Sequence, residues 1–321
     1  MPASNLARRA FLRSATAATA ASVFATPLIS ASKRISTAFI GLGVMGSENL
    51  KAAAALPAAA RPTFRAPVGI NIYSLRYLAE KDLPATLALI RELVIQEVEV
   101  GELYGRSAAE FRGLLKATGL HATSFGASYE ALDRDPDAVA GEARTLGAGY
   151  VVCSTIPHSS KHLAAKDCAP AADNLNRWGE RLAASRLRLC YHTHGTEFDS
   201  SPDGTRFDTL AKLTNPKFVH FEMDIFWIVY GHQDPVKLLR RYPGRFPLMH
   251  IKDIRKGTVL GGSPAEVREE DSVPLGTGLV DVRAALLAAR TCGVQHYYLE
   301  EEAVDAAPQI RQSLRFLASL R

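Results

Sequence analysis

From Val68 to the end of the chain, short apolar runs alternate with longer amphipathic stretches. The short runs are largely apolar, as expected of strands, and Leu187–His192 shows the two-residue alternation of a strand that packs one face on helices. The longer stretches have the spacing of helices with one buried face. These runs predict strands at Val68–Tyr73, Glu97–Val100, His121–Phe125, Tyr150–Ser154, Leu187–His192, Phe218–Asp224, Pro247–Ile251 and Tyr297–Glu300.

A predicted helix follows each of these strands. Asp137, Asp234 and Asp281 stand where helix N-caps are expected. Eight strand–helix units in about 255 residues fit a (β/α)8 barrel in size. The sequence therefore predicts an α/β fold, a (β/α)8 TIM barrel over residues 67–321, with an open doubly wound sheet as the alternative. The helices are expected at Leu83–Leu93, Ser107–Ala117, Asp137–Leu146, Ala165–Ser185, Phe207–Leu213, Pro235–Arg241, Val282–Arg290 and Pro308–Leu320.

The fifth predicted strand carries two histidines at its carboxyl end. Its alternation places His192 and His194 on the same side, about 6.5–7 Å apart along the backbone, and Gly195 ends it. Two imidazoles at a strand end can bind a metal or transfer a proton. Taken alone, they are equally consistent with an ordinary polar strand end.

Other strand ends supply further ionisable groups. In a TIM barrel the carboxyl ends of the strands form the active-site face. Convergence of His, Asp, His and Glu from four successive strands would make a divalent-metal site with open positions for substrate. Without a metal, such a cluster would be costly to desolvate. The candidates are Glu97, Glu99 and Glu102 on the second strand, His192 and His194 on the fifth, Glu222 and Asp224 on the sixth, His250, Lys252 and Asp253 on the seventh, and Glu300, Glu301 and Glu302 on the eighth.

The first 34 residues have the composition of an export leader. Arg8-Arg9-Ala10-Phe11-Leu12-Arg13 resembles the twin-arginine export motif, and a weakly apolar run follows from Ala15 to Ile29. That run is too short and too weakly hydrophobic to anchor the chain in a bilayer. We therefore expect residues 1–34 to be a twin-arginine signal peptide, with a periplasmic or otherwise exported mature protein and no stable membrane insertion.

Residues 35–66 are expected to be a linker. Ile40-Gly41-Leu42-Gly43-Val44-Met45-Gly46 matches the glycine fingerprint of dinucleotide-binding domains. The fingerprint requires a βαβ unit with an acidic residue about 20 positions on. Here Lys51–Pro67 is an Ala/Pro-rich stretch without a second strand, so we interpret the motif as degenerate and expect it to bind no nucleotide.

The net charge of +5 comes from the leader. Five of the 38 Lys and Arg residues lie within the first 34 positions, which leaves 33 basic residues against 33 acidic ones. A nearly neutral mature chain has no global basic field that would attract nucleic acid. We therefore expect a small-molecule partner rather than nucleic acid; the sequence does not indicate an oligomeric state.

Five segments together resemble the xylose-isomerase-like TIM barrels, the sugar phosphate isomerase/epimerase group. Their order and spacing along the barrel region make the resemblance specific. The segments are Tyr191-His192-Thr193-His194 with Glu197-Phe198; Asp224-Ile225-Phe226-Trp227 with Gly231 and Asp234-Pro235; Gly244-Arg245 with His250-Ile251-Lys252-Asp253; Pro274-Leu275-Gly276-Thr277-Gly278 with Asp281; and His296-Tyr297-Tyr298-Leu299-Glu300.

The resemblance implies one divalent metal ion (Mn, Mg or Zn). Its ligands would be Asp224, His250 and Glu300, with His192 as the fourth, although relatives often have Glu where His192 stands and His194 is the alternative fourth ligand. By position, the expected catalytic residues are Glu99, Lys252 and Glu300, and the expected substrate-binding residues are His194, Trp227 and Glu222.

One departure from the family concerns the third strand. Relatives often end this strand in His, whereas this chain has Ser124-Phe125-Gly126. A residue that contacts the substrate is thus replaced, so the usual substrate of the family is not implied.

A metal that binds two neighbouring sugar oxygens polarises a carbonyl and stabilises an enediolate. A carboxylate can then remove the proton next to that carbonyl. Return of the proton elsewhere gives isomerisation or epimerisation, which is the activity we expect from the resemblance. Loss of a β-substituent from the same intermediate would give a keto-sugar or keto-glycoside lyase or dehydratase. A carbohydrate-binding barrel without catalytic activity is the third hypothesis.

Overall fold

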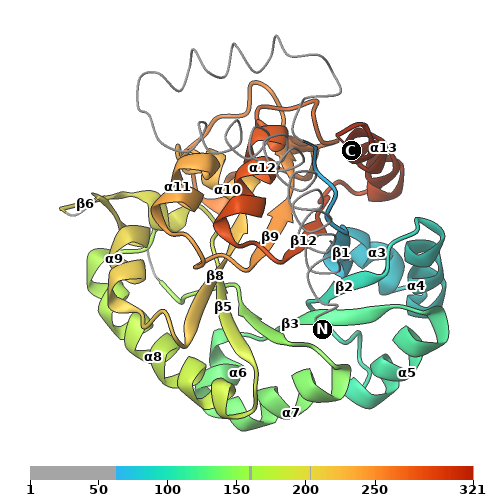
Figure 1. Cartoon of the computed structure of the whole chain (residues 1–321), viewed down its shortest axis with the longest axis horizontal. Helices are drawn as coiled ribbons and strands as arrows, with labels where there is room; N and C mark the ends of the chain where they lie inside the picture. The colour runs from blue at the N-terminus through green and yellow to red at the C-terminus, as the bar shows by residue number, and fades with distance from the viewer. Residues whose placement is uncertain (1–62, 159–160, 203, 321) are drawn as a thin grey trace, which may run out of the picture. The chain divides into compact units, whose positions relative to one another are not determined.

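The computed structural model describes residues 63–158, 161–202 and 204–320. Eight parallel strands close into a barrel in the order β1-β12-β9-β8-β5-β4-β3-β2, with helices around the outside (Figure 1). The predicted (β/α)8 TIM barrel is therefore confirmed, and the open doubly wound sheet is wrong. The strands are β1 (Gly69–Asn71), β2 (Glu97–Val100), β3 (His121–Gly126), β4 (Tyr150–Cys153), β5 (Arg188–His192), β8 (Val219–Asp224), β9 (Leu248–Ile251) and β12 (His296–Leu299).

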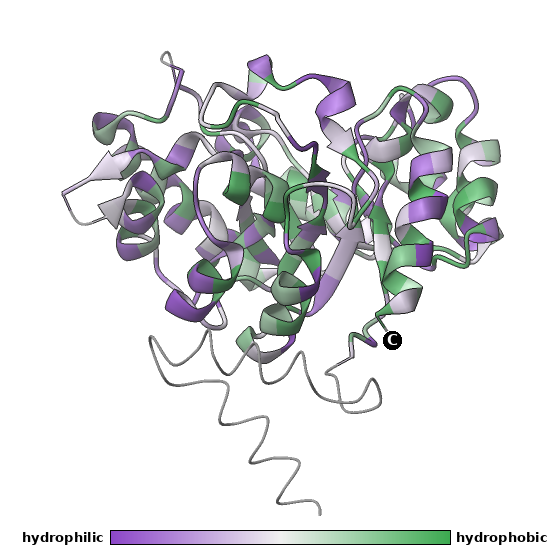
Figure 2. Ribbon diagram, turned by 90° about the horizontal axis from the view of Figure 1, so that it is seen from above, coloured by the Kyte–Doolittle hydropathy of each residue, from purple (hydrophilic) through white to green (hydrophobic). Residues whose placement is uncertain are grey.

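All eight predicted helices are present, within a few residues of the expected bounds. Their apolar stripes face the barrel, and Figure 2 shows the alternation of hydrophobic and hydrophilic residues along them. The main helices are α4 (Leu83–Glu92), α5 (Ala108–Thr118), α7 (Pro136–Leu146), α8 (Ala165–Ala184), α9 (Arg206–Leu213), α11 (Pro235–Arg241), α12 (Val282–Cys292) and α13 (Ala306–Ser319); α3 (Arg76–Ala79), α6 (Tyr129–Arg134) and α10 (Ile225–Tyr230) are shorter.

Side-chain caps explain where several helices begin. Asp234 and Asp281 cap α11 and α12 as predicted. The prediction that Asp137 caps α7 is wrong: Asp135 is the N-cap and accepts hydrogen bonds from the amides of Asp137 and Ala138. Pro136 explains the difference, because proline fits the first position of a helix and so places the cap one residue before it.

Two local structures at the active-site face differ from the predicted ones. The first strand is shorter than expected, because Ile72–Leu75 form a 3-10 turn, η2, instead of continuing it. The segment after β8, expected as a loop, is the helix α10. One carboxylate oxygen of Asp224, Oδ1, caps this helix by accepting hydrogen bonds from the amides of Phe226 at 2.8 Å and Trp227 at 3.3 Å.

Two small antiparallel hairpins lie outside the barrel: β6 (Ser200–Ser201) with β7 (Gly204–Thr205), and β10 (Asp253–Ile254) with β11 (Ser272–Val273). Buried Asp253 organises the segment after β11 by accepting hydrogen bonds from the amides of Gly276, Gly278 and Val280 at 2.9–3.0 Å. A Cβ at Gly278 would lie 2.2 Å from the carbonyl oxygen of Ile254, so only glycine fits there. Three further 3-10 turns are η3 (Thr196–Phe198), η4 (Pro264–Glu266) and η5 (Glu269–Asp271).

The barrel interior is a small cluster of buried side chains: Tyr150, Val152, Cys190, Leu248 and Tyr298. Because side chains alternate between the two faces of a strand, the residue two positions beyond each of these also points inward. Cys190, Leu248 and Tyr298 therefore place His192, His250 and Glu300 one layer further toward the carboxyl ends. The register supports this placement by pairing Asp224 with His250 and His192 with Glu222.

The described chain begins with a short extended segment that contacts the barrel. Phe64 is 2% exposed and packs edge-to-face on Tyr297, with ring centroids 5.0 Å apart. Its amide donates a 2.9 Å hydrogen bond to the carbonyl oxygen of Leu320. Residues 63–66, which we expected at the end of the linker, thus contact both β12 and the end of α13.

The predicted signal peptide at residues 1–34, the glycine motif at residues 40–46 and the linker up to residue 62 lie outside the described residues. Within the part of the chain that the structure describes, no helix combines the length and the apolar character needed to cross a membrane.

Candidate metal and active site

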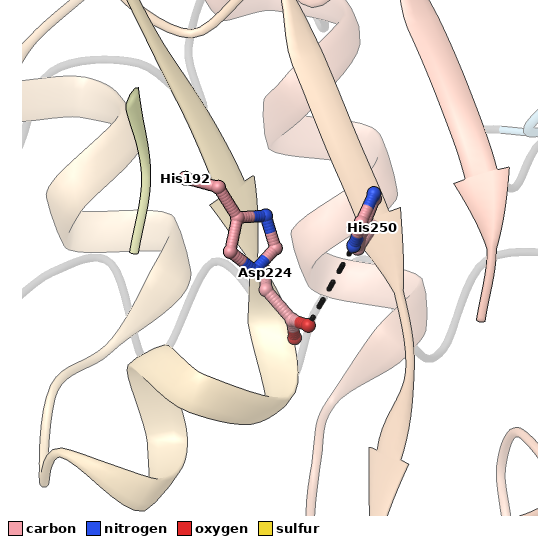
Figure 3. Close-up of side chains that lie close together, drawn as sticks. All are labelled: His192, Asp224 and His250. Carbon is pink, nitrogen blue, oxygen red and sulfur yellow. Dashed lines mark ion pairs between the residues drawn. The ribbon is translucent and has the colours of Figure 1, made fainter. Parts of the chain in front are cut away.

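Four inward-pointing side chains meet at the carboxyl ends of β5, β8, β9 and β12. His192, Asp224, His250 and Glu300 are at most 5% exposed. Candidate ligand atoms of the first three lie within 4.8 Å of one another, and Figure 3 shows these side chains converging from neighbouring strands. Glu300 joins them, because its Oε2 lies 3.2 Å from Nδ1 of His250.

An unpaired carboxylate oxygen at this point fits a divalent cation. Asp224 Oδ2 is buried without a hydrogen-bond partner and lies 3.9 Å from Nδ1 of His250, whose other close contact is Glu300 Oε2 at 3.2 Å. The other carboxylate oxygen of Asp224 already caps α10, so Oδ2 is free for a ligand. Buried polar atoms are rarely left unpaired, and two carboxylates with two imidazoles suit a divalent metal. His192, Asp224, His250 and Glu300 are therefore the residues that fit an ion.

The second nitrogen of His250 is held by a carboxylate. Its Nε2 lies 2.7 Å from Oε1 of Glu99, whose Oε2 accepts a 2.6 Å hydrogen bond from the hydroxyl of Ser124. This contact fixes the imidazole so that Nδ1 faces Asp224 and Glu300, an arrangement that commonly supports histidine ligands of metals. Glu99, expected to be catalytic, thus lies behind His250, and Ser124 supports it from the third strand.

Glu222 supports the other histidine in the same way. Its Oε2 lies 2.9 Å from Nδ1 of His192 and 3.5 Å from Nε2 of His250. Glu222, expected to bind substrate, is fully buried and contacts these two imidazoles instead. Glu99, Glu222 and His250 also lie close enough to form a ligand group. However, both carboxylates already bond to imidazole nitrogens, so we assign them to the support of the ligands.

The crowding of carboxylates changes their protonation. Burial, together with the charge of Glu99, raises the pKa of Glu222 well above its ordinary value. Burial also raises the pKa of Asp224 to about 7, although Lys252 opposes the shift. Two carboxyl groups that are expensive to ionise in the metal-free protein are the groups that a bound cation would stabilise as anions.

The pKa values of His250 and Glu300 shift in the directions that favour the charged form of each group, as expected for an ion pair. Burial opposes charge on the imidazole, but Glu222, Glu300 and Glu99 hold the pKa of His250 well above its ordinary value. Burial likewise opposes charge on Glu300, yet His250 and Lys252 hold the pKa of its carboxyl well below its ordinary value. The 3.2 Å contact between His250 Nδ1 and Glu300 Oε2 is the geometric basis of this pairing.

A buried ammonium group lies next to the ligands. Lys252 is fully buried, and its Nζ donates to Glu300 Oε1 at 3.3 Å and forms a short hydrogen bond with Glu302. The same nitrogen lies over the rings of Phe226, 4.6 Å from the centroid, and Trp227, 5.2 Å from the centroid. A desolvated ammonium with these partners is held rigidly beside the metal ligands.

The rings of His194 and Trp227 pack in sequence next to His192. The rings of His192 and His194 have centroids 4.5 Å apart, and those of His194 and Trp227 are 5.6 Å apart. Burial lowers the pKa of His194 to about 4, so its imidazole is neutral near pH 7. His194 is outside the group formed by His192, Asp224 and His250, so the geometry favours His192 over His194 as the fourth ligand.

Sequence reasoning missed two supporting contacts. Nδ2 of Asn71, at the end of β1, donates a 2.7 Å hydrogen bond to Glu300 Oε2. Glu197 is fully buried, accepts a short hydrogen bond from the hydroxyl of Tyr191, and accepts another at 3.2 Å from the amide of His194. The predicted strand Val68–Tyr73 placed Asn71 in its interior, whereas β1 ends at Asn71. The contact between Tyr191 and Glu197 depends on the turn at η3, which the sequence pattern did not reveal.

Comparisons with curated proteins find partial matches to inosose dehydratases. Among curated proteins, the chain is similar to the inosose dehydratase of Geobacillus kaustophilus, with 37% identity over 84 residues, 26% of each chain. It is also similar to the inosose dehydratase of Clostridium botulinum strain Eklund 17B, with 25% identity over 177 residues, which cover 49% of this chain and 58% of the relative. The matches thus span between about a quarter and three fifths of these two relatives.

Solved structures share the fold at low sequence identity. A sugar phosphate isomerase/epimerase from Parabacteroides distasonis aligns with a TM-score of 0.65 and 20% identity, covering 79% of this chain and 98% of that one. A zinc-bound IOLI protein aligns with a TM-score of 0.64 and 13% identity, covering 79% of this chain and 97% of that one. The probable 3-DHS dehydratase AsbF from Bacillus anthracis aligns with a TM-score of 0.61 and 15% identity, covering 78% of this chain and 98% of that one.

The family comparison covers most of the barrel. Residues 92–320 match the family described as xylose isomerase-like TIM barrel. This range holds all four candidate metal ligands, together with Glu99, Glu222 and Lys252. The chain belongs to the xylose isomerase-like TIM barrel family.

Proposed function

We propose that this protein is a divalent-metal-dependent lyase of the dehydratase type, acting on a keto-sugar or a related polyhydroxylated ketone. The observation that carries the proposal is the convergence of His192, Asp224, His250 and Glu300 around the unpaired Oδ2 of Asp224, beside the buried ammonium of Lys252. Two curated relatives are named inosose dehydratases, and one solved neighbour is named a probable 3-DHS dehydratase. These names favour elimination over isomerisation.

The metal would supply Lewis acidity toward the substrate carbonyl and an adjacent hydroxyl. His192, Asp224, His250 and Glu300 would hold it, with Glu99 and Glu222 orienting the two imidazoles. The zinc in the neighbouring IOLI structure supports a divalent ion, and the donor set of two carboxylates and two imidazoles is compatible with Zn, Mn or Mg.

The remaining side chains have roles that follow from their positions. Lys252 would stabilise negative charge that develops on the substrate oxygen, because its ammonium is desolvated and fixed by Glu300 and Glu302. His194, neutral near pH 7 and beside His192, is the candidate for moving a proton between the α-carbon and the leaving oxygen. Trp227 would bound the pocket on the side of His194.

Isomerisation or epimerisation is the second candidate. It begins with the same removal of a proton next to the carbonyl, and the neighbour from Parabacteroides distasonis is named a sugar phosphate isomerase/epimerase. The two outcomes differ in whether a β-oxygen leaves before the proton returns. A carbohydrate-binding barrel without turnover is the third candidate.

Mass analysis of products formed in deuterium oxide separates the three candidates. The metal-loaded protein is incubated with a panel of keto-inositols and keto-sugars. A lyase gives a product that has lost one water or one alcohol. An isomerase or epimerase gives a product with the substrate's composition and one deuterium on carbon. Saturable binding with neither change would contradict both enzymatic proposals.

Two variants test the assigned roles. Lys252→Met removes the charge while keeping an apolar side chain of similar length, and it should lower kcat by about 100-fold or more while the metal content stays near that of the wild type. His194→Ala should lower kcat by about 100-fold and leave metal content unchanged. Loss of metal in either variant would instead make that residue part of the metal site.

We propose further that the protein acts outside the cytoplasm. The support is the leader with Arg8-Arg9 at residues 1–34. Fusion of the leader to a reporter that requires folded export tests this proposal, with Arg8→Lys and Arg9→Lys together as the variant expected to abolish export. A reporter retained in the cytoplasm with the unaltered leader would contradict it.

A further inference from the structure

A partly exposed tyrosine lies just beyond the carboxyl end of β1, on the active-site face of the barrel. Tyr73 lies in η2, directly after β1, and is 46% exposed. Single exposed aromatic side chains are common on folded proteins, so exposure alone does not assign a role to this ring. Its position at the carboxyl end of β1 makes Tyr73 a candidate for contact with a ligand that extends out of the site.

Asn71 connects Tyr73 directly to the metal ligands. Nδ2 of Asn71 donates a 2.7 Å hydrogen bond to Glu300, and Oδ1 of Asn71 accepts a 3.1 Å hydrogen bond from the backbone amide of Tyr73. The charges of Glu302, Glu300 and Lys252 also act on the Tyr73 hydroxyl, whose pKa is raised chiefly by burial. The ring therefore lies within the electrostatic reach of the site, at its rim.

Arg76 fixes one face of this ring. Its guanidinium carbon lies 4.6 Å from the centroid of Tyr73 and 4.4 Å from that of Tyr77. The guanidinium is held in turn by Glu269 at 2.7 Å and by the carbonyl oxygen of Glu302 at 2.9 Å. One face of Tyr73 is thus packed against a braced cation, and its exposure leaves surface for a second stacking partner. A preorganised ring gains more from such a contact than a mobile one.

The charges near Tyr73 favour an uncharged partner. Lys252 is already bound to Glu300 and Glu302, and Arg76 is bound to Glu269. A phosphate beside Tyr73 could pair with Arg76 only if the ion pair of Arg76 with Glu269 broke, and the carboxylate of Glu302 would repel it. The stacking partner that fits is a neutral ring with an apolar face, either a sugar ring or an aryl group.

We propose that Tyr73 forms a stacking subsite for a neutral ring carried on the leaving oxygen, which makes the substrate a keto-glycoside rather than a free or phosphorylated keto-sugar. This inference rests on the proposed function for its chemistry. The base takes the proton from the carbon next to the carbonyl. The C–O bond to the ring-bearing substituent on the β-carbon then breaks. The leaving oxygen takes up a proton, so that the products are an unsaturated ketone and the alcohol of the ring.

The kinetic test compares keto-glycosides that differ only in the substituent: methyl, phenyl or glucosyl. Tyr73→Ala should lower kcat/KM for the phenyl and glucosyl compounds about five- to tenfold and for the methyl compound less than twofold, because one stacked aromatic contact contributes about 1 kcal/mol. Tyr73→Phe should keep the preference. Tyr77→Ala removes a similarly exposed tyrosine, 38% exposed, that also contacts Arg76, and serves as the matched control.

Equilibrium binding tests the subsite independently of turnover. Calorimetry with phenyl and methyl glycosides that lack the keto group should show the same five- to tenfold loss for Tyr73→Ala with the phenyl compound alone. If this loss appears but no substrate is turned over, the subsite stands and the proposed function fails. Equal effects of Tyr73→Ala on methyl and phenyl compounds would overturn the subsite, as would faster turnover of a phosphorylated keto-sugar than of any glycoside. Normal melting of each variant confirms that the fold is intact.

Discussion

Phe64 offers a quantitative test of where the barrel begins. The sequence placed the barrel from residue 67, whereas the structure packs Phe64 against Tyr297 with 2% of its surface exposed. Replacing a fully buried phenylalanine by alanine usually costs about 3–5 kcal/mol, through lost transfer energy and the cavity left behind. We therefore expect Phe64→Ala to destabilise the barrel by about this amount, at the lower end if the terminal segment can collapse onto Tyr297.

The expected change is large enough to measure by thermal or urea unfolding. For a domain of this size each kcal/mol shifts Tm by about 2–4 °C, so the fall in Tm should be on the order of 10 °C. Val259→Ala, at a position that is 85% exposed, is the control and should change stability by less than about 0.5 kcal/mol.

Two truncated chains complete this test. A chain that starts at Thr63 should melt like the mature protein, whereas one that starts at Arg65 should melt like Phe64→Ala. A fall in Tm of less than about 2 °C for Phe64→Ala would refute the reasoning and restore residue 67 as the boundary of the folded unit.

Three further predictions concern stability. Asp208→Asn should lower the free energy of unfolding by about 1–3 kcal/mol at pH 7. Burial alone would raise the pKa of Asp208, but hydrogen bonds from Tyr242, Thr205 and Arg241 outweigh it and hold the pKa below its ordinary value. The difference from the wild type should therefore shrink as the pH falls below about 4 in urea titrations. Val94 has φ 64°, and Val94→Gly should raise stability by about 1 kcal/mol by relieving this left-handed conformation; lower stability would contradict it. A divalent ion at 100 times its Kd should add about 2.7 kcal/mol to the free energy of unfolding, and a melting curve unchanged by chelator or added Zn, Mn or Mg would contradict it.

Most of the barrel was predictable because it depends on local patterns. Short apolar runs predicted the eight strands, and Asp234 and Asp281 marked helix starts that the structure confirms. Predictions were wrong where a single side chain overrides the pattern. Asp224 begins α10 directly at the strand end by capping it, and Pro136 moves the start of α7.

The positions of the site residues along the strands were also predictable from the sequence. Rules of strand polarity placed His192, Asp224, His250 and Glu300 at one end of the barrel, and the structure brings them together. The sequence did not predict which of the neighbouring side chains support these ligands by hydrogen bonds. Whether a carboxylate such as Glu222 faces the substrate or an imidazole depends on how deep its side chain lies, which requires the barrel's register and tilt. The contact between Asn71 and Glu300 likewise joins residues 229 positions apart.

Metal content tests the central proposal most directly. The purified mature protein should contain about one divalent ion per chain by mass spectrometry. Asp224→Asn and Glu300→Gln should each lose most of it while keeping the fold, because each replaces an anionic ligand by a neutral amide of the same shape. His192→Ala should lose more metal than His194→Ala, and the reverse order would move the fourth ligand to His194. Full occupancy in both Asp224→Asn and Glu300→Gln would contradict the site, and with it the metal-dependent elimination proposed for this barrel.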